Sequence, residues 1–284
     1  MKSPCGNLFQ VNARGFFMFS QSEQDELLDV ANALADAARE ITLRYFRSES
    51  LQADNKLDSG FDPVTIADRE AELAIRDILA MRRPDDAILG EEFGNKAGTS
   101  GLTWVIDPID GTRAFISGIP SWGVLIGLDA GGGPVLGVVD QPYMDERFIG
   151  AFGQANLTTR GETRDITTSN CQTLGEATLM TTFPEVGSNA ERLGFEAVRD
   201  SVKLTRYGLD CYAYALLAMG QIDLVIEAGL NPYDVQGPIG VIQAAGGVVT
   251  NWQGGPAHNG GRILAASNAR LHAQALGILS KVAD

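Results

Sequence analysis

Apolar residues recur every three or four positions over residues 23–47, which is the spacing of one face of an α-helix. A second stretch with this spacing covers residues 67–81 and is followed by Pro84, a residue type that ends helices. Both stretches carry polar residues on the opposite face. We therefore expect two amphipathic helices near the start of the chain, and each needs an apolar surface to pack on.

Short apolar segments replace the helical pattern after Pro84. Each segment is bounded by glycine, proline or aspartate, as sheet strands commonly are. The polar residues 157–170 predict a connection. The strands predicted before it cover residues 87–89, 104–106, 122–128, 136–139 and 147–151.

Strands and helices alternate in the second half of the chain. Predicted strands cover 177–181, 202–205, 224–227, 248–251 and 263–266, and predicted helices cover 189–198, 211–219, 234–245 and the residues from 268 onward. The run QGPIG at 236–240 is unusual in a helix, because Gly and Pro are poor helix formers.

The pattern predicts one folding unit of two lobes, covering about residues 21–155 and 156–284. The chain shows no internal repeat, low-complexity segment or flexible linker. Residues 1–20 lack the pattern and predict a loosely ordered extension. A single layered domain that follows a short extension is therefore expected.

Charge and cysteine content narrow the possible partners. The chain has 22 basic and 36 acidic residues, a net charge of −14, which opposes binding to nucleic acid or to an anionic membrane surface. Three separated cysteines suggest neither a disulfide framework nor a thiolate zinc site. No apolar run is long enough to span a membrane. We expect a cytoplasmic protein, and an anionic substrate would need cations at the site.

Candidate chemistry gathers at the run DPIDGT, residues 107–112, which directly follows the predicted strand 104–106. Asp107, Asp110 and the Ile109 carbonyl are the oxygen ligands that Mg²⁺ prefers. Pro108 stiffens the loop, and the amides of Gly111 and of the following threonine suit an anion if a helical turn begins there. Alone, the run is equally compatible with a solvent-exposed acidic turn.

Acidic groups also stand at the ends of other predicted elements. DPVT begins at Asp62 before a helix, GEE at 90–92 follows a strand, and NPYD ends at Asp234 where a helix begins. Each has a simple structural explanation, as a turn residue, a solvated loop or a helix cap. The joint pattern favours a metal site. The two histidines, His258 and His272, make a histidine triad or a histidine zinc site unlikely to be the basis of the chemistry.

The order and spacing of DPVT, GEE, DPIDGT and PYD resemble those of the inositol monophosphatase family over residues 23–284. This resemblance implies a layered αβαβα sandwich of the α+β class and a Mg²⁺-dependent phosphomonoesterase with two or three ions per site. It further implies a homodimer. The implied metal ligands are Glu91, Asp107, the Ile109 carbonyl, Asp110 and Asp234.

The implied catalytic residues are Glu91 at the metal cluster and Thr112 and Asp62, which activate water. The substrate would be a small phosphate ester. Its implied contacts are Gly111, Thr112, Arg113, Asp210, Glu227 and Asp234.

Three stretches are most similar to bacterial histidinol-phosphate phosphatases within the family: DGTRAFISG at 110–118, RYGLDCYAY at 206–214 and VIEAGLNPYD at 225–234. The carboxylates of Asp210 and Glu227 could pair with the ammonium or imidazole of histidinol phosphate. Alternatively, Asp210 caps the helix 211–219, and Glu227 is an exposed strand-end acid. Inositol 1-phosphate or another sugar phosphate is the second substrate prediction. A non-catalytic regulator that binds a phosphometabolite is the alternative of a different class.

Overall fold

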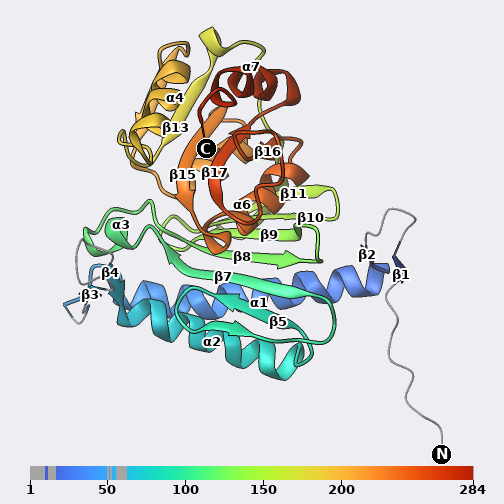
Figure 1. Ribbon diagram of the computed structural model, residues 1–284. Helices are drawn as coiled ribbons and strands as arrows, with labels where there is room; N and C mark the ends of the chain where they lie inside the picture. The colour runs from blue at the N-terminus through green and yellow to red at the C-terminus, as the bar shows by residue number, and fades with distance from the viewer. Residues whose placement is uncertain (1–9, 12–16, 50, 52, 56–62, 284) are drawn as a thin grey trace, which may run out of the picture.

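The protein is seen in a computed structural model that describes residues 10–11, 17–49, 51, 53–55 and 63–283. Helices and sheets alternate in five layers (Figure 1), which confirms the predicted αβαβα sandwich. The predicted loose extension falls mostly on residues outside the described ones, apart from the paired strands β1 (Gln10–Val11) and β2 (Phe17–Met18). The division into two lobes stays a prediction.

The first layer consists of α1 (Gln21–Tyr45) and α2 (Ile66–Arg82), which match the two predicted amphipathic helices. Each begins with a capping box, in which a hydroxyl side chain and an acid three residues later satisfy the first free amides. The short strands β3 (Ala53–Asn55) and β4 (Pro63–Thr65) pair just before α2. The apolar faces of α1 and α2 pack on the large sheet through a buried cluster that includes Leu34, Ile75, Trp104 and Ile126.

The second layer is an eight-stranded sheet in the order β12-β11-β10-β9-β8-β7-β5-β6. Its neighbours are antiparallel except for the parallel pair β5 and β7. The strands are β5 (Ala87–Gly90), β6 (Gly94–Lys96), β7 (Thr103–Asp110), β8 (Gly123–Asp129), β9 (Pro134–Gln141), β10 (Glu146–Ala151), β11 (Gln154–Thr159) and β12 (Glu162–Asp165).

Three strands of this sheet lie where no strand was predicted. The stretch 157–170, predicted as a connection, overlaps the end of β11 and contains all of β12, and β6 follows the GEE turn. All four residues of β12 are exposed, and β6 buries none of its three. These edge strands therefore lack the short apolar segment on which the prediction depends.

The middle layer contains α5 (Tyr212–Ala218) and α6 (Pro232–Ala244), and α6 begins two residues earlier than predicted. Packing explains the Gly residues of α6. Gly127, Gly137 and Gly150 stand side by side across β8, β9 and β10. A Cβ on Gly137 would lie 2.1 Å from the carbonyl oxygen of Gly237 in α6. The helix can lie this close to the sheet only because side chains are absent at the contact.

The second sheet has five strands in the order β14-β13-β15-β17-β16, and α4 and α7 cover its outer face (Figure 1). The predicted strand 202–205 is displaced along the chain to β14. None of the helices in the described part of the chain combines the length and apolarity needed to cross a bilayer. The elements of these two layers are the short 3₁₀ helix η1 (Leu174–Glu176), β13 (Thr178–Thr181), α4 (Asn189–Arg199), β14 (Leu204–Tyr207), β15 (Leu224–Leu230), β16 (Val248–Thr250), β17 (Gly261–Ala266) and α7 (Ala269–Leu279).

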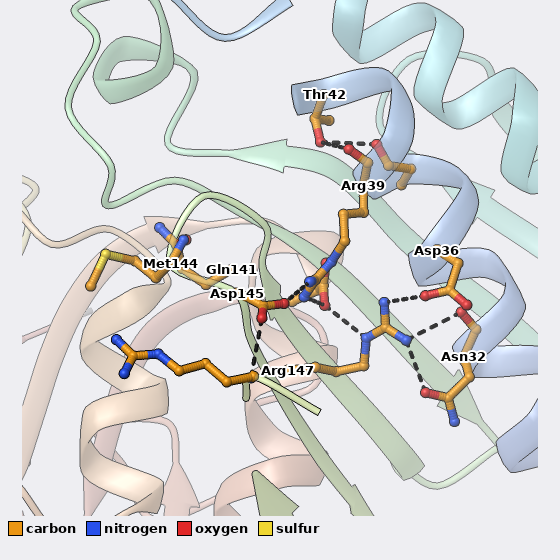
Figure 2. Close-up of polar contacts among 11 residues, drawn as sticks. Asn32, Asp36, Arg39, Thr42, Gln141, Met144, Asp145 and Arg147 are labelled. Carbon is orange, nitrogen blue, oxygen red and sulfur yellow. Dashed lines mark hydrogen bonds and ion pairs between the residues drawn. The ribbon is translucent and has the colours of Figure 1, made fainter. Parts of the chain in front are cut away.

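A network of ion pairs joins α1 to the large sheet (Figure 2). The fully buried carboxylate of Asp140 accepts two hydrogen bonds from Arg39, at 2.7 and 3.0 Å, and one from Arg147, at 2.7 Å. The two arginines also bind Asp145 and Asp36, respectively. Each charge in this network therefore has a partner of opposite charge.

Candidate active site

The DPIDGT run forms the end of β7 and the start of the short helix α3 (Thr112–Ile116). Asp107 pairs with Leu125 of β8, but Asp110 pairs with Gly123, so three steps on β7 match two on β8. Such a bulge re-aims side chains. In a regular strand, residues three apart point to opposite faces. The bulge therefore lets both aspartates serve one site.

Hydrogen bonds hold this loop in its shape. The Asp107 carboxylate accepts a bond of 3.0 Å from the backbone N–H of Ile109, and the Thr112 hydroxyl donates to the Ile109 carbonyl at 3.1 Å. The Asp110 carboxylate accepts a bond of 2.7 Å from the backbone N–H of Cys211, at the start of α5. The loop is thus joined to the middle helical layer.

Glu91 lies beside Asp107 because of the parallel pairing of β5 with β7. Gly90 is in register with Ile106, and the N–H of Glu91 donates to the Ile106 carbonyl at 3.2 Å. The residue that follows each of these is an acid, Glu91 after Gly90 and Asp107 after Ile106. The GEE motif is therefore placed next to the DPIDGT motif by sheet register.

A buried acid that the sequence did not single out supports this turn. The carboxylate of Glu72, on α2, accepts bonds from the backbone N–H groups of Glu92 and Phe93, at 2.7 and 3.2 Å, and from Arg76 at 2.8 Å. A Cβ on Gly90 would lie 2.0 Å from a Glu72 oxygen, so only glycine fits there. Only the fold shows that Glu72, on α2, lies beside the turn that carries Glu91.

Asp234 enters the site from the first turn of α6. The N–H of Asn231, the residue before the helix, donates to its carboxylate at 2.6 Å. The local capping role and a role in the site are therefore compatible. One carboxylate oxygen from each of Asp107, Asp110 and Asp234 lies within 4.8 Å of the others.

Electrostatics make this acidic group suited to a cation. Burial raises the pKa of Asp107 well above its usual value, and the charges of Glu91 and Asp110 add to this. Burial, followed by the charges of Asp210 and Asp234, does the same for the pKa of Asp110. No arginine or lysine in the described part of the chain forms an ion pair with the three aspartates. Clustered oxygen donors with uncompensated charge fit a hard divalent cation.

A pocket of about 350 Å³ opens on these carboxylates. Gly111 and Thr112 line it, where α3 begins. Arg113 is exposed, and its guanidinium carbon lies 5.4 Å from the ring centroid of Phe183. Asp62 lies outside the described residues, so its predicted place is not part of this geometry.

Asp210 and Glu227 both line the pocket but have different surroundings. Asp210 has a left-handed backbone (φ 45°), and its carboxylate accepts a bond of 2.9 Å from the Ser121 hydroxyl. It does not cap α5, which has no side-chain cap bond. Glu227 is 8 % exposed, so it is not a solvated strand-end acid. Its Oε1 accepts bonds of 2.7 and 3.0 Å from the N–H and hydroxyl of Thr182.

Comparison with known proteins agrees with the fold. The model of the inositol monophosphatase family matches residues 23–283. The chain is 42 % identical to the chloroplastic bifunctional phosphatase IMPL2 of Arabidopsis thaliana, over 90 % of this chain and 76 % of that protein. It is 36 % identical to the histidinol-phosphatase of Streptomyces coelicolor, over 89 % and 97 %. The structure of an inositol monophosphatase from Zymomonas mobilis superposes with a TM-score of 0.79, at 38 % identity and over 92 % and 99 %.

Fold, acidic cluster and relatives together define the class of the protein, a phosphoric monoester hydrolase. More particularly, the chain belongs to the inositol monophosphatase family. Both conclusions confirm the resemblance seen in the motifs.

Proposed function

We propose that the protein is a Mg²⁺-dependent phosphatase that hydrolyses a small phosphate ester by attack of water. The observation that carries this proposal is the group of three close aspartates that form no ion pair within the described part of the chain. Two or three bound Mg²⁺ would lower the pKa of water and balance the charge that develops on the phosphoryl and leaving oxygens. The proposed ligands are Glu91, Asp107, the Ile109 carbonyl, Asp110 and Asp234.

The remaining chemistry is assigned to the chain's own groups. Thr112 would orient the attacking water together with Asp62, and the Thr112 hydroxyl is already aligned by its bond to the Ile109 carbonyl. The amides of Gly111 and Thr112 would donate to the phosphate oxygens, because free N–H groups at a turn bind anions. Arg113, at the pocket rim, would add positive charge near the substrate.

Histidinol phosphate is the substrate that we propose. Support comes from relatives named histidinol-phosphatase in Streptomyces coelicolor and Mycobacterium tuberculosis, at 36 % and 35 % identity over nearly their whole length. The pocket-lining acids Asp210, which is half-buried, and Glu227, which is buried, would suit its cationic groups. Inositol 1-phosphate is the second candidate, since the Zymomonas mobilis protein of similar fold is an inositol monophosphatase. We further propose a homodimer, as the family resemblance implies, and a cytoplasmic location, which the separated cysteines favour.

A phosphate-release assay tests this proposal. Histidinol phosphate, inositol 1-phosphate, fructose 1,6-bisphosphate and 3′-phosphoadenosine 5′-phosphate would each be supplied with Mg²⁺ or with EDTA. We expect release to need Mg²⁺ and to be fastest with histidinol phosphate. Full activity after complete metal removal would refute the metal mechanism. A kcat/KM tenfold higher for inositol 1-phosphate, about 1.4 kcal/mol, would refute the substrate assignment.

A further inference from the structure

One residue that lines the pocket carries a buried hydroxyl with no hydrogen-bond partner among the residues that the structure describes. The hydroxyl belongs to Tyr214, which lies on α5 and is 4 % exposed. Leaving such a group unpaired costs about 1–3 kcal/mol. Buried polar groups are nearly always paired, so an unpaired one on a residue that lines a binding pocket is available to a ligand.

The charges around this hydroxyl are negative. Burial raises the pKa of Tyr214 well above its usual value, and the charges of Glu227 and Asp110 contribute next. The phenol therefore stays protonated and neutral at physiological pH. A group that approaches its oxygen from the pocket enters a region of negative potential, which favours a cationic hydrogen-bond donor over a neutral one.

Among the nearby acids, Glu227 is the one that a substrate cation would balance. The charges of Asp110 and Asp234 belong to the proposed metal cluster. Asp210 has the Ser121 hydroxyl and the positive charge of Arg113. Glu227 receives neutral bonds from Thr182 and forms no ion pair with the described residues.

We propose that Tyr214 is a substrate-binding residue whose hydroxyl oxygen accepts an N–H from a protonated amine or imidazole of the leaving group, while Glu227 balances its charge. This inference rests on the proposed phosphatase function. It assigns the substrate class as phosphate esters of amino alcohols. Polyol esters such as inositol 1-phosphate carry no cation for this pair of residues.

The variant Tyr214→Phe keeps the ring and removes only the hydroxyl. Tyr212→Phe is a matched control from the same helix, because the Tyr212 hydroxyl donates to Glu146 at 2.7 Å and does not line the pocket. Both full-length variants would be assayed with Mg²⁺ on histidinol phosphate and inositol 1-phosphate. We expect Tyr214→Phe to lower kcat/KM for histidinol phosphate about tenfold. The value for inositol 1-phosphate should change less than twofold, and Tyr212→Phe should alter neither.

A second measurement separates this inference from the choice of physiological substrate. Inhibition of the Mg²⁺-loaded enzyme by histidinol can be measured with whichever ester is turned over fastest. We expect its inhibition constant to rise about tenfold in Tyr214→Phe. The loss should be non-additive with Glu227→Gln, because both side chains would bind one group. Equal losses on both esters, an unchanged inhibition constant or additive effects would each overturn the role of Tyr214, whatever the wild-type preference.

Discussion

Two groups of buried acids on the same large sheet differ in how their charge is balanced. Asp140 on β9 is fully buried and accepts three hydrogen bonds from Arg39 and Arg147 (Figure 2). Asp107 on β7 is also buried and Asp110 is half-buried, yet neither forms an ion pair with the described residues. The arginines balance one group within the chain itself, whereas the other needs a ligand.

This difference separates a structural acid from a binding acid. Burying a charge is costly unless an opposite charge or hydrogen bonds compensate for it. At Asp140 the compensation comes from α1 and β10, so the folded chain alone satisfies it. At the aspartate cluster, Asp107 and Asp110 each accept a backbone N–H bond but have no opposite charge beside them, and burial together with the neighbouring acids raises the pKa of both. Mutations in the aspartate cluster should therefore mainly lower kcat, whereas mutations at Asp140 should mainly lower the free energy of unfolding.

The largest effect is expected from Asp107→Asn. Loss of this charge should lower kcat by about a thousandfold or more, roughly 4 kcal/mol, because a ligand of the proposed metal cluster is lost. In EDTA, however, the variant should unfold at a higher temperature than wild type, since a poorly solvated acid is removed. Phosphate release and thermal unfolding check the two parts. Wild-type activity, or a lower melting temperature in EDTA, would contradict the comparison.

Asp140→Asn should have the opposite effect, lowering stability rather than kcat. Removing one partner of a buried pair leaves two guanidinium groups poorly compensated, and we expect a loss of about 3–5 kcal/mol in the free energy of unfolding. Urea denaturation measures this loss. Asp36→Asn is the control, because Asp36 binds Arg147 from a side chain that is 69 % exposed, and such pairs contribute under about 1 kcal/mol. Equal losses in the two variants would remove the structural role of Asp140.

Much of the fold could be predicted from sequence because the apolar residues of its buried helices and strands stand out clearly from the polar residues around them. The amphipathic faces of α1 and α2 and the apolar cores of β7 and β8 follow the spacing of helices and strands. The edge strands β6 and β12 could not be found this way, since neither buries a residue. The Gly-Pro run in α6 was predicted to be unfavourable, and only the glycine row on the sheet explains it.

The candidate site could likewise be predicted only in part. Motifs with acids at element ends could be recognised, because chemistry requires those residue types close together. The bulge between Asp107 and Asp110, and the support of the Glu91 turn by Glu72, depend on contacts between elements far apart in the chain. Tyr214 carried no signal either, since an apolar helix face also contains core tyrosines. Only its unpaired hydroxyl distinguishes it.

The stability of the metal-free protein should depend on pH. Burial, the largest cause, raises the pKa of Asp68 and Glu227 to about 7 and that of Asp234 to about 6. Between the ordinary acid pKa and these values, the folded state binds more protons than the unfolded one. The free energy of unfolding in EDTA should therefore fall by a few kcal/mol as pH rises from about 4 to about 7, then level off.

Mg²⁺ should restore part of that loss, by about 2.7 kcal/mol at a concentration 100 times its dissociation constant. Urea titrations at several pH values, with Mg²⁺ or EDTA, measure both effects. The variant Asp107→Asn should show a smaller Mg²⁺ effect, whereas Asp140→Asn should keep the wild-type one. A metal-free stability that rises from pH 5 to 7 would show that these acids are already compensated in the folded chain.

Glu72→Gln should have the smallest effect of the four, and it tests whether the two kinds of acid are distinct. Glu72 is fully buried and compensated by Arg76, as Asp140 is by its arginines, yet its two amide bonds hold the turn that carries Glu91. We expect kcat to fall about tenfold, roughly 1.4 kcal/mol, because the turn loosens while every proposed metal ligand remains. Asp77→Asn, an exposed change on the same helix, is the control.

The metal dependence of this variant distinguishes the explanations. If Glu72 acts by positioning Glu91, the Mg²⁺ concentration for half-maximal activity should rise together with the loss of kcat, and saturating Mg²⁺ should recover part of the activity. If Glu72 is structural in the manner of Asp140, the free energy of unfolding should fall while kcat per folded molecule and the Mg²⁺ requirement stay at wild-type values. The second result would place Glu72 with the internally balanced acids, and would limit the ligand-requiring group to residues that line the pocket itself.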